Sequence, residues 1–421
     1  MGYGHNRAAY ALGDYVSLPV MDIDDAPLAQ ADEQKRWARI RAGYERLSRA
    51  SAAAGPLGGP MRALLENITG IPSLYPRRDL SRPNLSARLL EREIRRGLGQ
   101  DFKSYLQDQA GPMVSTFYAP AIMADRLGIK NVYCVVTDSD INRVWAPYDP
   151  ASSHLIYCVP SQRARRRLRA YGVSAEQIRV TGFPLPHELL GGPQLTSLKH
   201  NLAKRLHRLD PFGSFRKEIH YESLQLLGAE FEHAQDTQPP RLSYAVGGAG
   251  AQTQIVEHFL PSCAELLREN RLRITLVAGI RNEVAENLKN ILNKLEMQDL
   301  LGTSIDILVE DDIAAYFKSF NTLMADTDIL WTKPSELSFF AALGLPVICA
   351  WPVGVHERYN RRWLIENGAG FKQRDPKHAG EWLKDWIKDG TLAAAAWSAF
   401  VRLPKHGLYE IADAVFASNK T

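Results

Sequence analysis

Three glycines in four positions stand where an apolar run meets a helical pattern, in the stretch YAVGGAGAQTQIVEHF (244–259). Glycine allows the backbone to approach a ligand closely, and the first turn of a helix offers free N–H groups and the positive end of its dipole. The stretch therefore suits a diphosphate, although a plain tight turn explains the same glycines. It has neither the G-x-G-x-x-G spacing nor a Walker lysine. The candidate residues are Gly247, Gly248, Gly250 and Ala251.

Polar side chains also follow the apolar run that ends at Thr332, in TKPSEL (332–337). Ser335 is predicted to be the N-cap of a helix over 335–343. Glu336 opens that helix, where a carboxylate can satisfy the helix dipole or accept hydrogen bonds from ribose hydroxyls. Lys333 and Ser335 are interpreted, with Glu336, as donor-binding candidates.

A third group lies in GVHERYN (354–360), after the next apolar run. His356 and Asn360 are four residues apart and are expected to share one helix face, with Glu357 beside them. Histidine, carboxylate and amide side chains suit sugar hydroxyls. The spacing itself is common, so the prediction depends on the position after a strand.

Two residues of the first half are the catalytic candidates. His5 follows the glycines of MGYGH at the head of a predicted short helix and is placed for base or phosphate chemistry, unless it is an ordinary surface histidine. Asp138 and Asp140, in VVTDSD (135–140), suit orientation or deprotonation of an acceptor hydroxyl, and Asp138 is the base candidate. Trp145 is positioned to stack on a sugar ring. The sequence shows no metal-ligand spacing and no catalytic triad, and we expect no metal or cofactor.

The elements that must position these residues alternate between strand and helix. A helix over 162–171 is predicted to be capped by Ser161 and ended by Gly172. This alternation predicts parallel sheets covered by helices, with ligands at the carboxyl ends of the strands. The predicted strands are 112–117, 131–137, 154–159 and 178–182 in the first half, then 242–247, 273–278, 305–309, 328–332 and 346–351.

At 421 residues the chain is too long for one ordinary core. Segment 187–240 contains GGP, DPFG and QPP and is predicted to be an inter-domain insert. It separates an N-terminal domain, 1–186, from a C-terminal domain, 241–390, with final helices in 391–421. No apolar run precedes MGYGH, so we expect the first strand of the N-terminal domain to be missing, through truncation or a misassigned start.

The composition of the chain limits the classes of protein and partner that it fits. Hydrophobic residues make up 45%, charged residues 23%, and the net charge of +4 is mild, so no nucleic-acid partner is expected. The four cysteines have no disulfide or metal spacing, and Cys134, Cys158 and Cys349 lie in apolar runs typical of a core. No signal peptide and no apolar run of about 18–20 residues is present, which favours a cytoplasmic protein. The arginines of 163–169 and 92–96 are either solvated faces or contacts to anionic lipid on the inner face of a membrane.

The order of these motifs resembles the GT-B glycosyltransferases. It runs G-x-G-H near the start, GG-x-GA after a mid-chain strand, then T-K-P-S-E-L, A-L-G-L-P-V, E-x-x-N and G-A-G. The peptidoglycan N-acetylglucosaminyltransferase and the monogalactosyldiacylglycerol synthases are the most similar members, mainly over 111–186 and 241–371. Two departures stand out: Pro334-Ser335-Glu336 replaces a frequent glycine pair, and Arg143 stands near the place of a histidine of the galactolipid branch.

The resemblance implies two Rossmann-like doubly wound domains that face each other across a cleft, with C-terminal helices returning to the N-terminal domain. It implies a hexosyltransferase that moves a sugar from a nucleotide-sugar, commonly UDP-linked, to a hydroxyl acceptor, lipid-linked in the galactolipid branch. The mechanism would be inverting and metal-independent, with the nucleotide-sugar as co-substrate.

The resemblance also assigns roles to residues. Gly247, Gly248, Gly250 and Ala251 would line the diphosphate, Glu336 would bind the ribose, and Glu357 and Asn360 would contact the transferred sugar. His5 would lie near acceptor and diphosphate, and Asp138 would be the base. Two alternatives stay open: a nucleotide-sugar 2-epimerase on the same fold, and a nucleotide-sugar-binding protein without catalysis.

Overall fold

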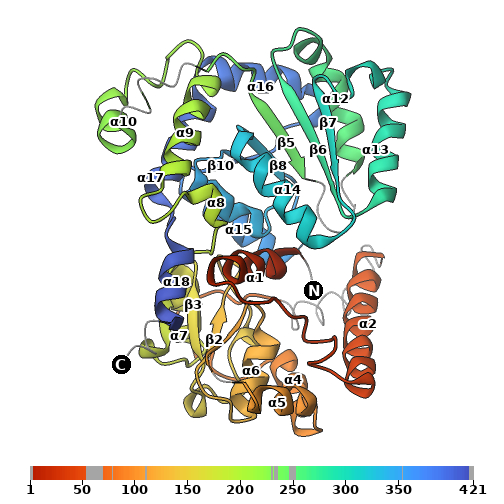
Figure 1. Cartoon of the computed structure of the whole chain (residues 1–421), viewed down its shortest axis with the longest axis vertical. Helices are drawn as coiled ribbons and strands as arrows, with labels where there is room; N and C mark the ends of the chain where they lie inside the picture. Colours follow the sequence, from red (N-terminus) through yellow and green to blue (C-terminus); the bar gives the residue numbers. More distant parts are fainter. Residues whose placement is uncertain are drawn as a thin grey trace. The chain divides into compact units, whose positions relative to one another are not determined.

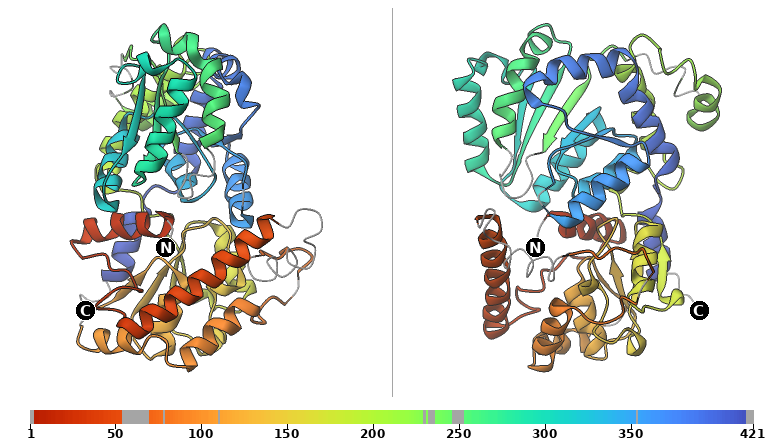
Figure 2. Two further views of the ribbon diagram at one scale, coloured as in Figure 1. Left: turned by 90° about the vertical axis from the view of Figure 1, so that its right-hand side faces the viewer. Right: turned by 180° about the vertical axis from the view of Figure 1, so that it is seen from behind.

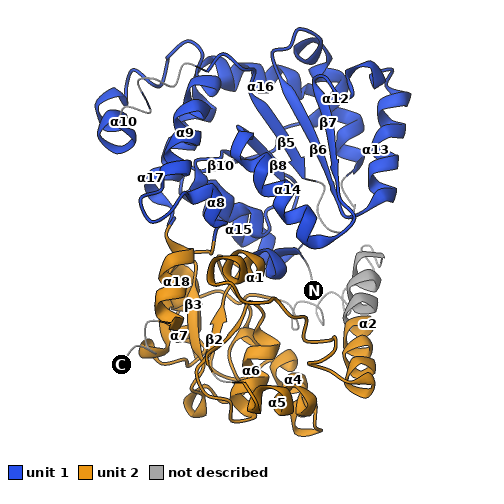
Figure 3. Ribbon diagram, in the orientation of Figure 1, with its two compact units in different colours: residues 1–7, 185–405 blue, residues 8–184, 406–421 orange. Residues whose placement is uncertain are grey.

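The chain divides into two compact units in a computed structural model (Figure 3). Unit 1 comprises residues 1–7 and 185–405, and unit 2 comprises residues 8–184 and 406–421. The structure describes residues 3–53, 70–77, 79–109, 111–228, 231, 236–245, 253–352 and 354–416, without the side chains of 44–53.

Unit 2 contains a four-stranded parallel sheet in the order β1-β2-β3-β4 (Figure 1). A helix follows β1 and another follows β3, as the alternation predicts. The strands are β1 (Met113–Ser115), β2 (Val132–Val135), β3 (Ile156–Val159) and β4 (Ile178–Val180). The helices are α1 (Tyr3–Val16, whose first residues belong to unit 1), α2 (Ala31–Ala53), α4 (Leu85–Arg95), α5 (Gln100–Gln107), α6 (Tyr118–Arg126), α7 (Gln162–Ala170) and α18 (Gly407–Phe416).

Unit 2 contains the helix cap, the helix end and the buried cysteines that the sequence predicts. The Ser161 hydroxyl accepts a hydrogen bond from the Ala164 N–H at the start of α7, and Gly172 follows this helix with φ of +94°. Cys134 and Cys158 are fully buried, and burial raises the pKa of the Cys158 thiol to about 12. The predicted cap, helix end and core cysteines are therefore confirmed.

Unit 1 contains a six-stranded parallel sheet in the order β10-β9-β8-β5-β6-β7. The chain runs outward from β5 to β7 and then returns to place β8 on the other side of β5. The order of the strands therefore reverses between β5 and β8, and this reversal is where doubly wound sheets form a crevice. The strands are β5 (Arg241–Ala245), β6 (Arg273–Gly279), β7 (Ile305–Val309), β8 (Ile329–Thr332), β9 (Val347–Cys349) and β10 (Gly370–Lys372).

The helices of unit 1 lie on both faces of its sheet (Figures 1 and 2). Right-handed crossovers place the helices after β5 and β6 on one face and those after β7, β8 and β9 on the other. The first group is α12 (Thr253–Arg268) and α13 (Asn282–Lys294), with α16 (Ala379–Lys388) against α12; the second is α14 (Ile313–Asp326), the 3-10 helix η6 (Glu336–Leu343) and α15 (Val355–Glu366). Trp331 is fully buried in this core, against Tyr244, Phe259 and Trp382.

The expected fold class, two α/β domains with parallel sheets, is confirmed. The last helix, α18, belongs to unit 2, where Tyr409 packs on Tyr15, as the expected return of the C-terminal helices requires. Segment 187–240, expected as an insert, contributes helices to unit 1, which in its described residues include α8 (His187–Leu190), α9 (Thr196–Leu209) and α10 (His220–Leu227). Strand β10 was not among the predicted elements, and α17 (Thr391–Arg402), which lies in the range 391–421 expected to hold the final helices, belongs to unit 1.

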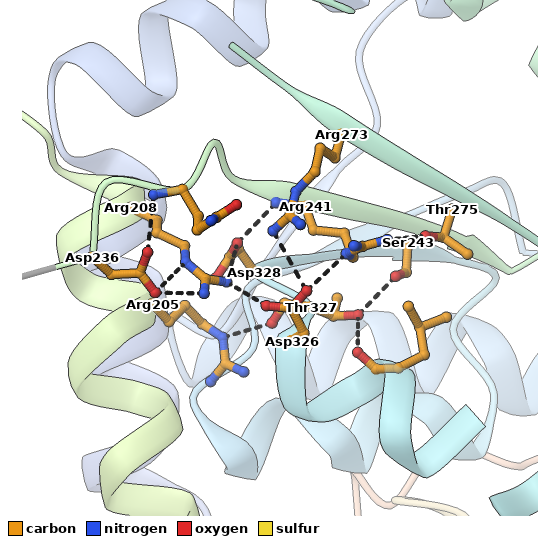
Figure 4. A network of polar contacts seen from close by, with 12 residues as sticks. Arg205, Arg208, Asp236, Arg241, Ser243, Arg273, Thr275, Asp326, Thr327 and Asp328 are labelled. Carbon is orange, nitrogen blue, oxygen red and sulfur yellow. Dashed lines mark hydrogen bonds and ion pairs between the residues drawn. The ribbon is translucent and has the colours of Figure 1, made fainter. Parts of the chain in front are cut away.

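A dense network of charges covers the amino ends of β5, β6 and β8 (Figure 4). Arg208 of α9 lies 2.6 Å from Asp236, 2.8 Å from Asp326 and 3.3 Å from Asp328. Arg241 lies 3.1 Å from Asp326 and donates its backbone N–H to Asp328 at 2.8 Å. The network ties α9 to the sheet at the edge opposite to the carboxyl ends of the strands.

The pKa values of the carboxylates in this network are shifted in opposite directions. Burial opposes ionisation of Asp326, but the hydrogen bond and charge of Arg208 outweigh it and hold the pKa of Asp326 below its usual value. The pKa of Asp236 is lowered in the same way. At Asp328 burial wins, so its pKa is raised despite the charges of Arg208 and Arg205.

We predict that Arg208→Met lowers the free energy of unfolding by about 3–5 kcal/mol at pH 7, because it leaves Asp328 buried without its cation. Asp236 and Asp326 have folded pKa values below the unfolded value, so the stability that they contribute is present above about pH 4 and is lost as the pH falls below it. The penalty should therefore shrink in acid. Urea unfolding at pH 7 and at about pH 3 or below measures it.

Arg271→Met is the matched control, because the Arg271–Glu269 pair is about half exposed and its loss should cost less than about 1 kcal/mol. Equal penalties for the two variants, or an Arg208→Met penalty that grows in acid, would contradict this account.

Candidate functional site

The carboxyl ends of all six strands of unit 1 meet at one edge of the sheet, because the strands are parallel. At the reversal of strand order, the loops after β5 and β8 are neighbours, since these strands pair directly. The loop after β5 carries Gly247, Gly248, Gly250 and Ala251, which lie outside the described residues. Their assignment to a diphosphate stays a prediction.

Lys333 follows β8 and forms an ion pair with Glu357, at 3.0 Å between Nζ and Oε1. The other oxygen of Glu357 accepts the Gly354 N–H at 3.2 Å and so satisfies the N-cap backbone of α15. The Glu357 side chain is 3% exposed and that of Lys333 is 31% exposed. Glu357 thus bonds within the fold and holds the ammonium of Lys333 at the open edge of the sheet.

His356 and Asn360 lie in the same helix, α15, with opposite exposure. Asn360 is fully buried, whereas His356 is exposed, with its ring over Gly354. The two residues predicted to share one helix face therefore differ in access to a ligand, because the face of α15 that carries Asn360 packs into unit 1.

Glu336 opens η6, directly after the loop that follows β8. Its side chain is 11% exposed, and its Oε1 lies 3.7 Å from Nε of Arg7. Ser335 occupies the N-cap position of η6, as predicted, but in the described part of the chain its side chain makes no capping bond. The Ser335 N–H instead donates to the Lys333 carbonyl at 2.8 Å.

The first turn of α1 packs against this edge of unit 1, which the sequence did not reveal. Tyr3 stacks on Tyr316 of α14 with 5.3 Å between ring centroids, and its hydroxyl lies 3.5 Å from the N–H of Ile280, just after β6. A Cβ added at Gly4 would lie 3.0 Å from Oε2 of Glu336. His5 belongs to the same helical turn and is partly buried.

Arg7, at the end of the same helical turn, is also a residue of this edge that the sequence did not reveal. Its side chain is 2% exposed, and Nη2 donates to the Tyr316 hydroxyl at 3.3 Å. Burial raises the pKa of Tyr316 although Arg7 opposes the shift, so this hydroxyl stays neutral and can accept the bond. The four-residue spacing of Tyr3 and Arg7 places both on one helix face, and this spacing is the only signal that the sequence offered.

In unit 2, Asp138 lies partly buried in the loop after β2, and its role as a base stays a prediction. Asp140 is fully buried and is bonded by Arg167 at 2.8 and 2.9 Å and by Arg163 at 2.6 Å. The suggestion that Asp140 acts on an acceptor is therefore wrong, because its carboxylate is enclosed by two guanidinium groups.

Two neighbouring positions are also structural. Trp145 is 5% exposed and packs on Tyr118 at 5.4 Å between ring centroids, so the expectation that it stacks on a sugar is wrong. Arg143 is buried and donates to the carbonyls of Ser81, Ala146 and Pro147. Burial lowers the pKa of Arg143.

The arginine cluster 163–169 is not one solvated face. Arg167 is completely buried, and the side chain of Arg163, bonded to Asp140, is 25% exposed. The expectation that the whole cluster faces a membrane is therefore corrected to three exposed members, Arg165, Arg166 and Arg169.

The described residues carry neither a metal-binding cluster nor a membrane-spanning helix. No group of three or more His, Cys, Asp or Glu side chains there is arranged to hold a metal ion. None of the helices described combines the length and the apolar character needed to span a bilayer.

A family model described as a domain of unknown function, DUF6938, matches residues 294–418. No curated protein matches the chain. Among solved structures, MnaA of S. aureus in its UDP co-structure aligns at 12% identity with a TM-score of 0.47, covering 79% of this chain and 80% of that one.

Two further structures show the range of similar proteins. The UDP-GlcNAc 2-epimerase of Neisseria meningitidis bound to UDP-GlcNAc aligns at 13% identity and a TM-score of 0.41, covering 76% of this chain and 82% of that one. A glycosyltransferase of Rickettsia africae aligns at 12% identity and a TM-score of 0.38, covering 80% and 81%. Similarity at this level assigns no reaction to this chain.

We predict that Glu357→Ala destabilises the protein by about 1–3 kcal/mol, because it removes the N-terminal cap of α15 and the partner of Lys333 together. Thermal or urea denaturation measures the loss. Glu366→Ala is the control on the same helix: its pair with Arg362 is more than half exposed and should contribute less than about 1 kcal/mol. If Glu357→Ala lowers the free energy of unfolding no more than the control does, Glu357 does not stabilise the start of α15 or the position of Lys333.

Proposed function

We propose that the chain is a GT-B type hexosyltransferase that moves a sugar from a nucleotide-sugar, UDP-linked in our assignment, to a hydroxyl acceptor. The observation that carries the proposal is the polar group at the strand reversal of unit 1, where Lys333 and Glu336 follow β8 directly beside the loop after β5. The motif order of the sequence supports it.

The chemistry that we assign is a direct displacement. The acceptor oxygen attacks the anomeric carbon, the bond from that carbon to the diphosphate oxygen breaks, and the configuration inverts. The base, Asp138 in this proposal, takes the hydroxyl proton, and the nucleoside diphosphate leaves with the electron pair. General base catalysis of this kind contributes about 10²–10⁴-fold.

Most of the remaining acceleration would come from binding the charge that develops on the diphosphate. Backbone N–H groups of the loop after β5 and the start of α12 would donate to it, and the Lys333 ammonium, held by Glu357, would add a positive charge. Glu336 would accept hydrogen bonds from the ribose and fix the donor in the attack geometry. His5, in the helix turn that packs beside Glu336, would lie near the diphosphate.

We predict that Glu336→Ala weakens UDP binding by about 10-fold or more, as expected for loss of a charged hydrogen-bond acceptor. Asp138→Ala should leave UDP binding within about twofold and should abolish most turnover, because a base acts in the reaction and not in donor binding. Calorimetric titration with UDP measures the first effect, and release of UDP from a panel of nucleotide-sugars, with and without EDTA, measures the second.

The outcomes separate the alternatives. Equal loss of UDP binding in both variants would contradict the division of roles. Conversion of a UDP-sugar to its epimer without UDP release would favour the epimerase, and UDP binding with no reaction of any donor would favour a binding protein. Absence of binding by every nucleotide tested would refute all three functions.

We also propose contact with an anionic membrane, through α4 as well as through the exposed arginines of α7. One face of α4 presents Leu85 and Leu89, 42% and 46% exposed, alternating with exposed Arg88 and Arg92 at helical spacing. Beside it, a hollow of about 630 Å³ is lined by Arg36, Arg39 and Ile40 of α2 together with Glu93 and Arg96.

Co-sedimentation with phosphatidylglycerol vesicles should be strong at low salt and should fall as salt rises. It should weaken by about 30-fold in Arg88→Gln/Arg92→Gln, since each of the two basic residues near such a surface contributes about 1 kcal/mol. Arg268→Gln/Arg271→Gln, at two exposed arginines of unit 1, is the charge-matched control. Sedimentation that ignores salt and anionic lipid would rule out this contact.

A further inference from the structure

Arg7 is a buried cation that the proposed reaction does not yet use. Its guanidinium carbon lies 4.1 Å from the ring centroid of Phe320, 4.7 Å from that of Phe317 and 5.5 Å from those of Tyr316 and Phe340. These faces supply cation–π attraction, and the Tyr316 hydroxyl supplies one acceptor. An aromatic enclosure of this kind fixes a planar guanidinium in one orientation.

The hydrogen-bond capacity of Arg7 is mostly unused. Its Nε and Nη1 atoms are buried and find no hydrogen-bond partner among the residues described. The carboxylate that forms an ion pair with it is that of Glu336, at 3.7 Å from Nε. A buried charge is costly unless it is paired, so this pair couples the position of Glu336 to that of Arg7.

Glu336 is also confined from a second side by the same helical turn. A Cβ added at Gly4 would lie 3.0 Å from Oε2, 3.2 Å from Cβ and 3.3 Å from Cδ of Glu336. Tyr3 anchors that turn to α14 and to the end of β6. The carboxylate therefore has little room to rotate, while its side chain keeps 11% exposure.

From this geometry we infer that Arg7 is a positioning residue for nucleotide recognition, which fixes the carboxylate of Glu336 so that it accepts hydrogen bonds from the ribose hydroxyls. The inference deepens the proposed function and rests on it. Arg7 touches no nucleotide itself, since its donor atoms are buried. Its effect passes through Glu336 and is specific to the ribose.

The test compares UDP with 2′-deoxy-UDP, by calorimetric titration of the full chain. The native protein should prefer UDP by about 10-fold or more, as expected when a charged acceptor loses one hydroxyl partner. Arg7→Met should reduce this preference to about threefold or less, and in a Glu336→Gln background it should change the preference no further.

Arg241→Met is the matched control, because Arg241 is a largely buried arginine at the opposite edge of the same sheet, 15% exposed and paired with Asp326 at 3.1 Å. It should lower the melting temperature and leave the preference for UDP unchanged. An Arg7→Met protein that binds both nucleotides equally less well, with the preference intact, would overturn the inference and leave the proposed function standing. A native protein that binds neither nucleotide would overturn both.

Two milder variants decide the matter if Arg7→Met does not fold. Tyr316→Phe removes the acceptor of Arg7 Nη2 and should reduce the preference by about twofold to threefold. Gly4→Ala should displace the Glu336 side chain by a few tenths of an ångström, and alanine has a higher helix propensity than glycine. This variant should therefore also reduce the preference for UDP. An unchanged preference in both variants would overturn the role of Arg7.

Discussion

Parallel pairing of the strands is the constraint on which unit 1 depends. Because all six strands point the same way, the loops that follow the strands all leave from one edge, which is the edge where doubly wound sheets bind ligands. The reversal between β5 and β8 then determines which of these loops are neighbours. Lys333 and Glu336 owe their position to this topology.

The two edges of the sheet use charge in opposite ways. At the amino edge, Arg208 and Arg241 share Asp326 and Asp328, so that charges are paired within the fold. At the carboxyl edge, the pairs of the described residues include the partly exposed ammonium of Lys333, held by buried Glu357. A charge held at an open edge can act on a ligand, whereas a charge enclosed in a network cannot.

Much of the fold could be predicted from the sequence because buried parallel strands read as apolar runs and their helices begin directly after them. Strand β10 was not predicted from the sequence, because it comprises only Gly370–Lys372 and has one bulky apolar side chain. The bounds of α17 were not predicted, because its run of alanines carries little contrast between faces, although alanine favours helix strongly.

The site was less predictable, since its contacts join distant parts of the chain. Lys333 and Glu336 were found through their position after a strand, but the partner of Glu336, Arg7, lies more than 300 residues away in sequence and shows no motif. Trp145 and Asp140 were misjudged for the converse reason: a residue type that suits a ligand also suits a core, and only packing against Tyr118 or Arg167 distinguishes the two.

The central claim is that the carboxyl edge of unit 1 binds a nucleoside diphosphate at the strand reversal. A crystal structure of the chain with UDP tests it most directly. The account predicts the diphosphate on the backbone of residues 246–252 near Lys333, with the ribose hydroxyls on the carboxylate of Glu336. UDP bound at any other place, with Lys333 and Glu336 away from the nucleotide, would contradict it.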